Sequence, residues 1–222
     1  MNSSKSPGDK AGAGARLEYE RRKKSREDEV RKKHPHLGGL MLALQEPPQH
    51  ETRWAKGAEG EEMVAKELEK RCSNETVILF HDRRIPKSRA NIDHIAITAK
   101  GVWVIDSKRY KGKITVDKPW RGSERLLVNG WDKTSLVGGL IRQKGLVRDV
   151  VAAKFSGVPI HGVLCFVGSD WGLFQKPMTI GGAKIMWPKA VAKELNEAGP
   201  LKQEHMLMIA NLINRTFPPY SK

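Results

Sequence analysis

The stretch NIDHIAITAKGVWVIDSK, residues 91–108, decides the expected fold. Two runs rich in β-branched and apolar residues flank residues 99–101, a pattern typical of two antiparallel strands joined by a turn. Each run also carries an aspartate, Asp93 or Asp106, where an apolar residue would pack better. A buried carboxylate is costly unless it is paired, hydrogen-bonded or bound to a cation. These two acids therefore call for a chemical explanation.

Side-chain alternation predicts how the two strands pair. In each strand the aspartate shares a face with the aliphatic residues two and four positions away. If Thr98 pairs with Gly101, both sets lie on one face of the sheet and Asp93 falls opposite Asp106, with Cβ atoms roughly 4.5–5.5 Å apart. A type I turn with Gly101 as a bulge would shift the register by one and move Asp106 to the other face. We favour the first register because it buries the aliphatic residues together.

Two carboxylates this close repel each other, and one would hold a proton at neutral pH unless a cation lay between them. Mg²⁺, with Mn²⁺ as a possible substitute, binds such oxygen ligands together with waters and phosphate oxygens. The Ser107 carbonyl is a candidate backbone ligand, and Glu61, on the inner face of a helix predicted over residues 57–71, is a candidate third carboxylate. Lys108 could orient or help deprotonate an attacking water and offset phosphate charge. The alternative is a structural ion network of the two aspartates and Lys108.

The rest of the chain predicts an α/β domain with a mixed central β-sheet flanked by helices. In a helix expected over residues 134–155, Gln143 recurs with apolar residues at helical spacing, so it should point inward or into a cleft. Strands are expected at 77–83, 112–118, 125–130, 159–168 and 183–187, and further helices at 187–199 and 201–217.

The N-terminal part has a different composition. Residues 1–53 are expected to form a basic, partly disordered arm and linker, and residues 54–222 the folded domain. Residues 1–14 hold almost nothing to bury, which indicates disorder. The charged run at 15–33 is either a solvated helix or coil, or a basic arm that touches phosphates. Residues 34–53 are expected to be the linker.

Charge is the clearest signal in the composition. The chain of 222 residues has 40 Lys and Arg against 25 Asp and Glu, a net charge of +15. Such an excess indicates a polyanionic partner, most often nucleic acid and less often an anionic membrane. Cys72 and Cys165 lack the spacing of a zinc site or a disulfide framework. No apolar run approaches the ~20 residues of a membrane span, and no signal peptide is evident, so we expect no membrane association and a cytoplasmic protein.

Basic side chains on both sides of the hairpin are candidates for phosphate contacts. Three aromatic or imidazole side chains nearby have a plainer interpretation: His94 is expected to be packed or hydrogen-bonded, and Trp103 and Trp131 to be packing residues. The candidate nucleic-acid contacts are Arg83, Arg84, Lys87, Arg109 and Lys111.

The segments GAEGEEMVAKEL (57–68), HDRRIP (81–86) and NIDHIAITAKGVWVIDSKRYKGKI (91–114) closely resemble the NERD (nuclease-related) domain, a family of the PD-(D/E)xK restriction-endonuclease-like superfamily. The resemblance implies a restriction-endonuclease-like core with a mixed four-stranded sheet. It also implies that Glu61, Asp93 and Asp106 are metal-binding acids. Lys108 would be the catalytic lysine, and Gln143 the helical glutamine that contacts substrate or water. Asp106 stands where many superfamily members have Glu.

Together these observations predict a Mg²⁺-dependent nuclease that hydrolyses phosphodiester bonds, with DNA as the expected substrate. A second hypothesis is a nucleic-acid-binding module with a nuclease-like fold that is non-catalytic or depends on a partner. A third is a structural domain whose basic surface binds another polyanion. The oligomeric state stays open.

Overall fold

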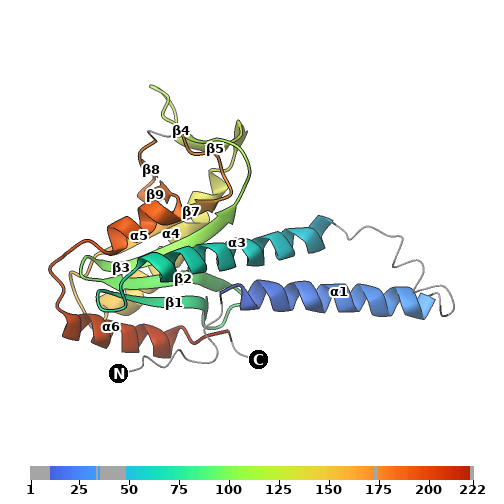
Figure 1. The fold of residues 1–222 in the computed structure, drawn as a ribbon, viewed down its shortest axis with the longest axis horizontal. Coiled ribbons are helices and arrows are strands. Elements are labelled where there is room, and N and C mark those ends of the chain that lie inside the picture. The colour runs from blue at the N-terminus through green and yellow to red at the C-terminus, as the bar shows by residue number, and fades with distance from the viewer. Residues whose placement is uncertain (1–10, 34, 36–48, 173–174, 221–222) are drawn as a thin grey trace.

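The computed structural model describes residues 11–33, 35, 49–172 and 175–220. It is a mixed α/β fold with helices on both faces of a central sheet (Figure 1). The helices are α1 (Ala13–Lys33), α3 (Gln49–Arg71), α4 (Ser135–Ala152), α5 (Pro188–Leu195) and α6 (Gln203–Thr216). The strands are β1 (Val77–Arg84), β2 (Asn91–Thr98), β3 (Gly101–Arg109), β4 (Ile114–Asp117), β5 (Arg125–Val128), β6 (Trp131–Asp132), β7 (Ile160–Val167), β8 (Met178–Ile180) and β9 (Ala183–Met186).

The central sheet is mixed and has six strands in the order β1-β2-β3-β7-β9-β8. Strands β1, β2 and β3 form an antiparallel meander. Strand β7 runs parallel to β3, β9 runs parallel to β7, and β8 is antiparallel to β9. Strands β1, β2, β3 and β7 form a mixed four-stranded core, as the resemblance implies, and β9 and β8 extend it to six strands. The strands predicted at 112–118 and 125–130 do not join this sheet: β4, β5 and β6 form a separate three-stranded sheet.

The register predicted for the central hairpin is confirmed. Thr98 pairs with Gly101, and the ladder continues to His94 and Ile105. Gly101 has φ +126, and a Cβ there would lie 2.3 Å from the Pro159 carbonyl oxygen, so only glycine fits at this turn. The Thr98 hydroxyl accepts the Lys100 N–H at 3.1 Å and thereby stabilises the turn. Burial of the aliphatic face thus outweighs the poor turn propensity of the Ala-Lys pair.

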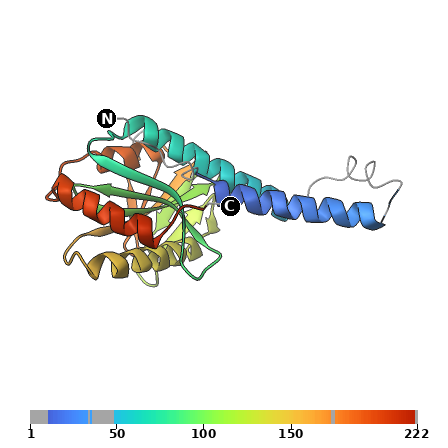
Figure 2. The same cartoon turned by 90° about the horizontal axis from the view of Figure 1, so that it is seen from below.

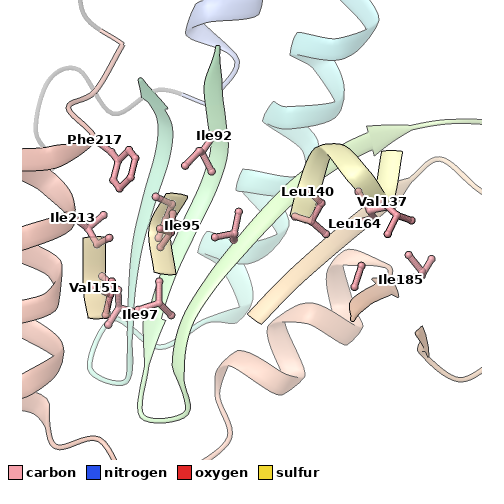
Figure 3. Close-up of a cluster of buried hydrophobic side chains, with 14 of the residues drawn as sticks. Ile92, Ile95, Ile97, Val137, Leu140, Val151, Leu164, Ile185, Ile213 and Phe217 are labelled. Carbon is pink, nitrogen blue, oxygen red and sulfur yellow. The ribbon is translucent and has the colours of Figure 1, made fainter. Parts of the chain in front are cut away.

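Two apolar layers cover the sheet. On one face α4 and α6 pack against Ile95, Ile97 and Leu164 (Figure 3). On the opposite face, which α3 and α5 cover, Trp103 is 1% exposed and donates its indole N–H to Thr98 Oγ1 at 3.1 Å. The packing role predicted for Trp103 is confirmed.

Helices α1 and α3 lie side by side and extend away from the sheet (Figures 1 and 2). The run at 15–33 is a helix with no apolar stripe, and it carries intrahelical ion pairs such as Glu18–Arg22 at 2.6 Å. The expectation of a linker over 34–53 is wrong for its last five residues, because α3 begins at Gln49. Residue 34 and residues 36–48 of that linker, and residues 1–10 of the expected disordered segment, lie outside the described residues. Within the described residues, no helix combines the length and the apolar character that crossing a bilayer requires.

Candidate functional site

The two hairpin aspartates lie together at the open end of the β2–β3 pair, one position beyond the His94–Ile105 pair. Asp93 is 9% exposed and Asp106 is 7% exposed. The Ser107 backbone N–H donates to Asp93 Oδ2 at 2.8 Å. Lys108 Nζ donates to Asp106 Oδ1 at 2.6 Å and to the Ser107 carbonyl oxygen at 3.2 Å. Four residues singled out in the sequence therefore meet at one place.

Glu61 comes to this place from α3, which packs on the other face of the sheet. A Cβ at Gly60 would lie 2.9 Å from the Arg109 Cβ, so the helix approaches the end of β3 this closely because residue 60 is glycine. Glu61 is 9% exposed, and its Oε2 atom is buried without a hydrogen-bond partner among the described residues. Its neighbour Glu62 forms an ion pair with Arg16.

Burial and mutual repulsion set the protonation of these groups. Burial, followed by the charge of Asp106, raises the pKa of Asp93 to about 8. Burial, followed by the charge of Asp93, raises the pKa of Glu61 well above its usual range. Burial alone would lower the pKa of Lys108, but the charges of Asp106 and Asp93 outweigh it and raise that pKa. Burial and repulsion thus favour the protonated forms of Asp93 and Glu61, and the two aspartates favour the ammonium form of Lys108.

The raised pKa of Asp93 predicts a pH dependence of stability in the metal-free protein. Its pKa rises from the usual 3.8 to about 8 on folding, so between these values the native state binds one proton more than the unfolded chain. The free energy of unfolding should consequently fall as the pH rises from about 5 to about 8. Urea denaturation in EDTA at a series of pH values measures this slope. Asp93→Asn should flatten it, and parallel profiles for the two proteins would contradict the assignment.

The three acids do not all converge on one point. Within the described residues, no group of three or more His, Cys, Asp or Glu side chains is arranged to hold a metal ion. Nitrogen donors bond to both aspartates: Lys108 donates to Asp106, and the Ser107 amide donates to Asp93. The structure places the carboxylates of Asp93 and Asp106 and the Ser107 carbonyl oxygen together. Glu61 is close enough that the charge of Asp93 raises its pKa.

His94 lies behind the site, on the face of β2 opposite the acids, and is fully buried. Its Nδ1 lies 2.8 Å from His81 Nδ1, and its Nε2 lies 2.8 Å from Ser107 Oγ. Burial lowers the pKa of His94 well below its usual value, so the ring is neutral. The expectation that His94 is hydrogen-bonded is confirmed. No pattern in the sequence pointed to His81 as its partner, although alternation places His94 and Ser107 on one face.

Asp82 is a second residue that sequence reasoning missed. It has φ +47 and is fully buried. Its Oδ2 accepts the Gly14 N–H of α1 at 2.5 Å, and its Oδ1 accepts the side-chain N–H of Asn91. Its carbonyl oxygen accepts the Tyr220 N–H at 3.0 Å. Asp82 thus holds together the start of α1, the start of β2 and the C-terminal segment. Its negative charge also contributes to the raised pKa of Glu61.

Gln143 lies on α4, as predicted, and its Oε1 is buried. That oxygen has no hydrogen-bond partner among the described residues, the acids included. The inward orientation expected from its spacing is therefore seen, without a contact to the aspartates.

The basic residues of the expected nucleic-acid surface divide into two groups. Arg84, Lys87, Arg109 and Lys111 are exposed, and Arg109 forms an ion pair with Glu59 at 2.8 Å. Arg83 does not lie on that surface: it is 1% exposed, packs 4.4 Å from the centre of the Phe80 ring and donates to Asn214 Oδ1 at 3.0 Å. The reason is that β1 turns this side chain toward α6, which covers it.

In a comparison with protein-family models, residues 56–167 match the family described as NERD, Nuclease-related domain. This segment is about half of the chain and contains every acid of the site, Lys108 and Gln143. Searches of curated proteins and of solved structures gave no match.

Proposed function

The chain belongs to the NERD (nuclease-related domain) family, and from this membership we propose that it is a metal-dependent nuclease that hydrolyses phosphodiester bonds of DNA. The observation that carries the proposal is the meeting of Asp93, Asp106 and the Ser107 carbonyl with Lys108 at the end of one hairpin. Acids and a lysine in this arrangement bring together ligands for a cation and a charge for a phosphate.

The donor set fits a hard divalent cation. Its oxygens come from two carboxylates and a backbone carbonyl, which are the ligand types that Mg²⁺ prefers, with Mn²⁺ as a substitute. Glu61 would be a further ligand, since its Oε2 is buried and has no hydrogen-bond partner in the described part of the chain. A bound ion would polarise the phosphorus–oxygen bond and lower the pKa of a water molecule. Asp93 and Glu61 would release their protons to hold it.

Lys108 would act as a cation rather than as a base. Its pKa is raised, so at neutral pH it holds its proton and cannot accept one from water. Its ammonium bonds to Asp106 and to the Ser107 carbonyl, two of the oxygens that would hold the ion. We propose that it exchanges these bonds for a phosphate oxygen, which offsets developing negative charge and orients the attacking water. Gln143 would contact substrate or water, and Arg84, Lys87, Arg109 and Lys111 would contact flanking phosphates.

A specific observation favours a second candidate function, a nucleic-acid-binding module without its own hydrolysis. Lys108 already neutralises Asp106, and in the described residues no three acids are arranged around a metal position. A protein in this state would bind phosphates through its positive charge and would cleave them only after a partner rearranged the acids.

The deciding experiment incubates the protein with linear, circular and single-stranded DNA in Mg²⁺, Mn²⁺ or EDTA. The variants Asp106→Ala and Lys108→Ala are assayed in parallel. We expect cleavage with either metal, no cleavage in EDTA, and loss of cleavage in both variants. Binding without cleavage under every condition would establish the second candidate instead, and equal cleavage by wild type and variants would indicate a contaminating nuclease.

A further inference from the structure

Two tryptophans are exposed at the small sheet of β4, β5 and β6: Trp120 in the loop between β4 and β5, and Trp131 in β6. Trp120 is 90% exposed and Trp131 is 73% exposed. The sequence-based expectation that Trp131 packs is therefore wrong: its ring is exposed, although its strand partner Val128 is buried. Tryptophan buries more apolar area than most residues when it packs, so two rings in solvent on one small element indicate a contact surface.

The same element, residues 111–133, which we call the wing, has free positive charge. Its acids are satisfied locally: Asp117 pairs with Arg125 at 2.6 Å and Glu124 pairs with Lys118 at 2.8 Å. Asp132 accepts the Thr134 N–H at 2.8 Å. Four further cations of the wing form no ion pair with any described residue: Lys111, Lys113, Arg121 and Lys133. Of these, Arg121 lies over one face of the Trp120 ring, 4.8 Å from its centroid, so a base would stack on the other face of Trp120. Such a surface is complementary to a polyanion.

The wing is attached next to the candidate site. The chain leaves β3 at Arg109 and enters β4 at Ile114, and β4 and β5 lie beyond the end of β3 (Figure 1). The Asn129 N–H donates to the Lys113 carbonyl at 2.8 Å, which holds the turn before Trp131 against the segment that leaves the site. The Asp170 N–H donates to the Gly112 carbonyl at 3.0 Å and fixes that segment to the end of β7.

We propose that the wing binds unpaired nucleotides, with bases stacked on Trp131 and Trp120 and phosphates held by its unpaired lysines and Arg121. Exposed aromatic rings among cations are the features by which proteins bind single strands, since every unpaired base offers a face for stacking. A fully paired duplex hides those faces. The inference rests on the proposed function and refines its substrate: the nuclease acts on single-stranded segments or frayed ends that the wing holds beside Asp106 and Lys108.

The test measures binding by fluorescence anisotropy in EDTA, so that cleavage plays no part. The probes are a labelled single-stranded oligothymidylate and a blunt hairpin duplex. Trp131→Ala and Trp120→Ala should each weaken single-strand binding about tenfold and change duplex binding less than about twofold. Trp131→Phe should keep most of the affinity, because phenylalanine still stacks. Leu207→Ala, which alters a 51% exposed apolar residue on α6, is the matched control and should bind like wild type.

Unchanged single-strand affinity in Trp131→Ala, or an equal loss for single strand and duplex, would overturn the inference. So would a change in molar mass on Trp131→Ala with nucleic-acid binding intact, since the wing would then be a contact between copies of the chain. The outcome is separable from that of the cleavage assay. A wild type that cuts DNA while the tryptophan variants bind normally refutes only the inference, and tryptophan-dependent binding without cleavage refutes only the nuclease.

Discussion

Asp106→Asn is expected to slow metal-dependent cleavage of DNA by at least about a thousandfold, because an ion ligand supplies several kcal/mol of transition-state stabilisation. The amide keeps the shape of the side chain but loses the charge that would hold the cation. It also loses the charge that pairs with Lys108, whose Nζ lies 2.6 Å from Asp106 Oδ1. The measurement is the initial rate of cleavage of a labelled oligonucleotide at saturating Mg²⁺.

A matched variant separates this effect from a general change in charge. Asp149→Asn removes a carboxylate that is 68% exposed on α4 and paired with Arg148, and it should cleave at the wild-type rate. Thermal unfolding of Asp106→Asn should stay cooperative, because the substitution is nearly isosteric. If the folded Asp106→Asn protein cleaves within tenfold of wild type, the acid pair is structural and the nuclease proposal loses its central residue.

Asp82→Ala is expected to lower the free energy of unfolding by about 3 kcal/mol, the largest effect on stability that we predict. The substitution leaves the Gly14 N–H and the Asn91 side chain without their buried acceptor. It also places alanine at φ +47, a left-handed conformation that aspartate and asparagine tolerate better. Urea denaturation monitored by tryptophan fluorescence measures the change.

Two companion variants divide this effect between its causes. Asp82→Gly removes the carboxylate but relieves the backbone strain, so it should recover about 1 kcal/mol relative to Asp82→Ala. Asp82→Asn keeps an acceptor oxygen and should lose about 1 kcal/mol. Hydrogen exchange at Gly14 should accelerate in Asp82→Ala, since its amide loses its partner. A loss below 1 kcal/mol with unchanged exchange at Gly14 would show that α1 is held by other contacts.

Local patterns were sufficient for most of the fold. The period-two alternation in residues 91–108 predicts the register that brings Asp93 to Asp106, because slipping by one residue would expose a row of aliphatic side chains. Helical spacing places Glu61 on the inner face of α3 and turns Gln143 inward. These predictions succeed because the spacing of apolar residues along a single strand or helix shows which of its faces is buried, whichever distant element covers that face. The size of the sheet was less predictable, since β8 and β9 are short and their pairing depends on β7.

The burial or exposure of several side chains depends on packing between elements distant in the sequence, which the alternation along one strand does not show. Arg83 is buried because α6 covers β1, whereas Trp131 lies on the edge strand β6 and is exposed although its strand partner Val128 is buried. Glu61 joins the aspartates from the opposite face of the sheet through the close contact of Gly60 with Arg109.

By itself, the sequence determined the family, the mixed α/β class and the pairing of the hairpin that carries Asp93, Asp106 and Lys108. These features can be read from the sequence because they depend on the apolar periodicity of single elements and on the motif at residues 91–108. Only the tertiary structure decided the charge states of the site and the attachment of α1 through Asp82, because both depend on desolvation and on neighbours far away in the chain. It also decided that Lys108, rather than a third carboxylate, is the closest partner of Asp106.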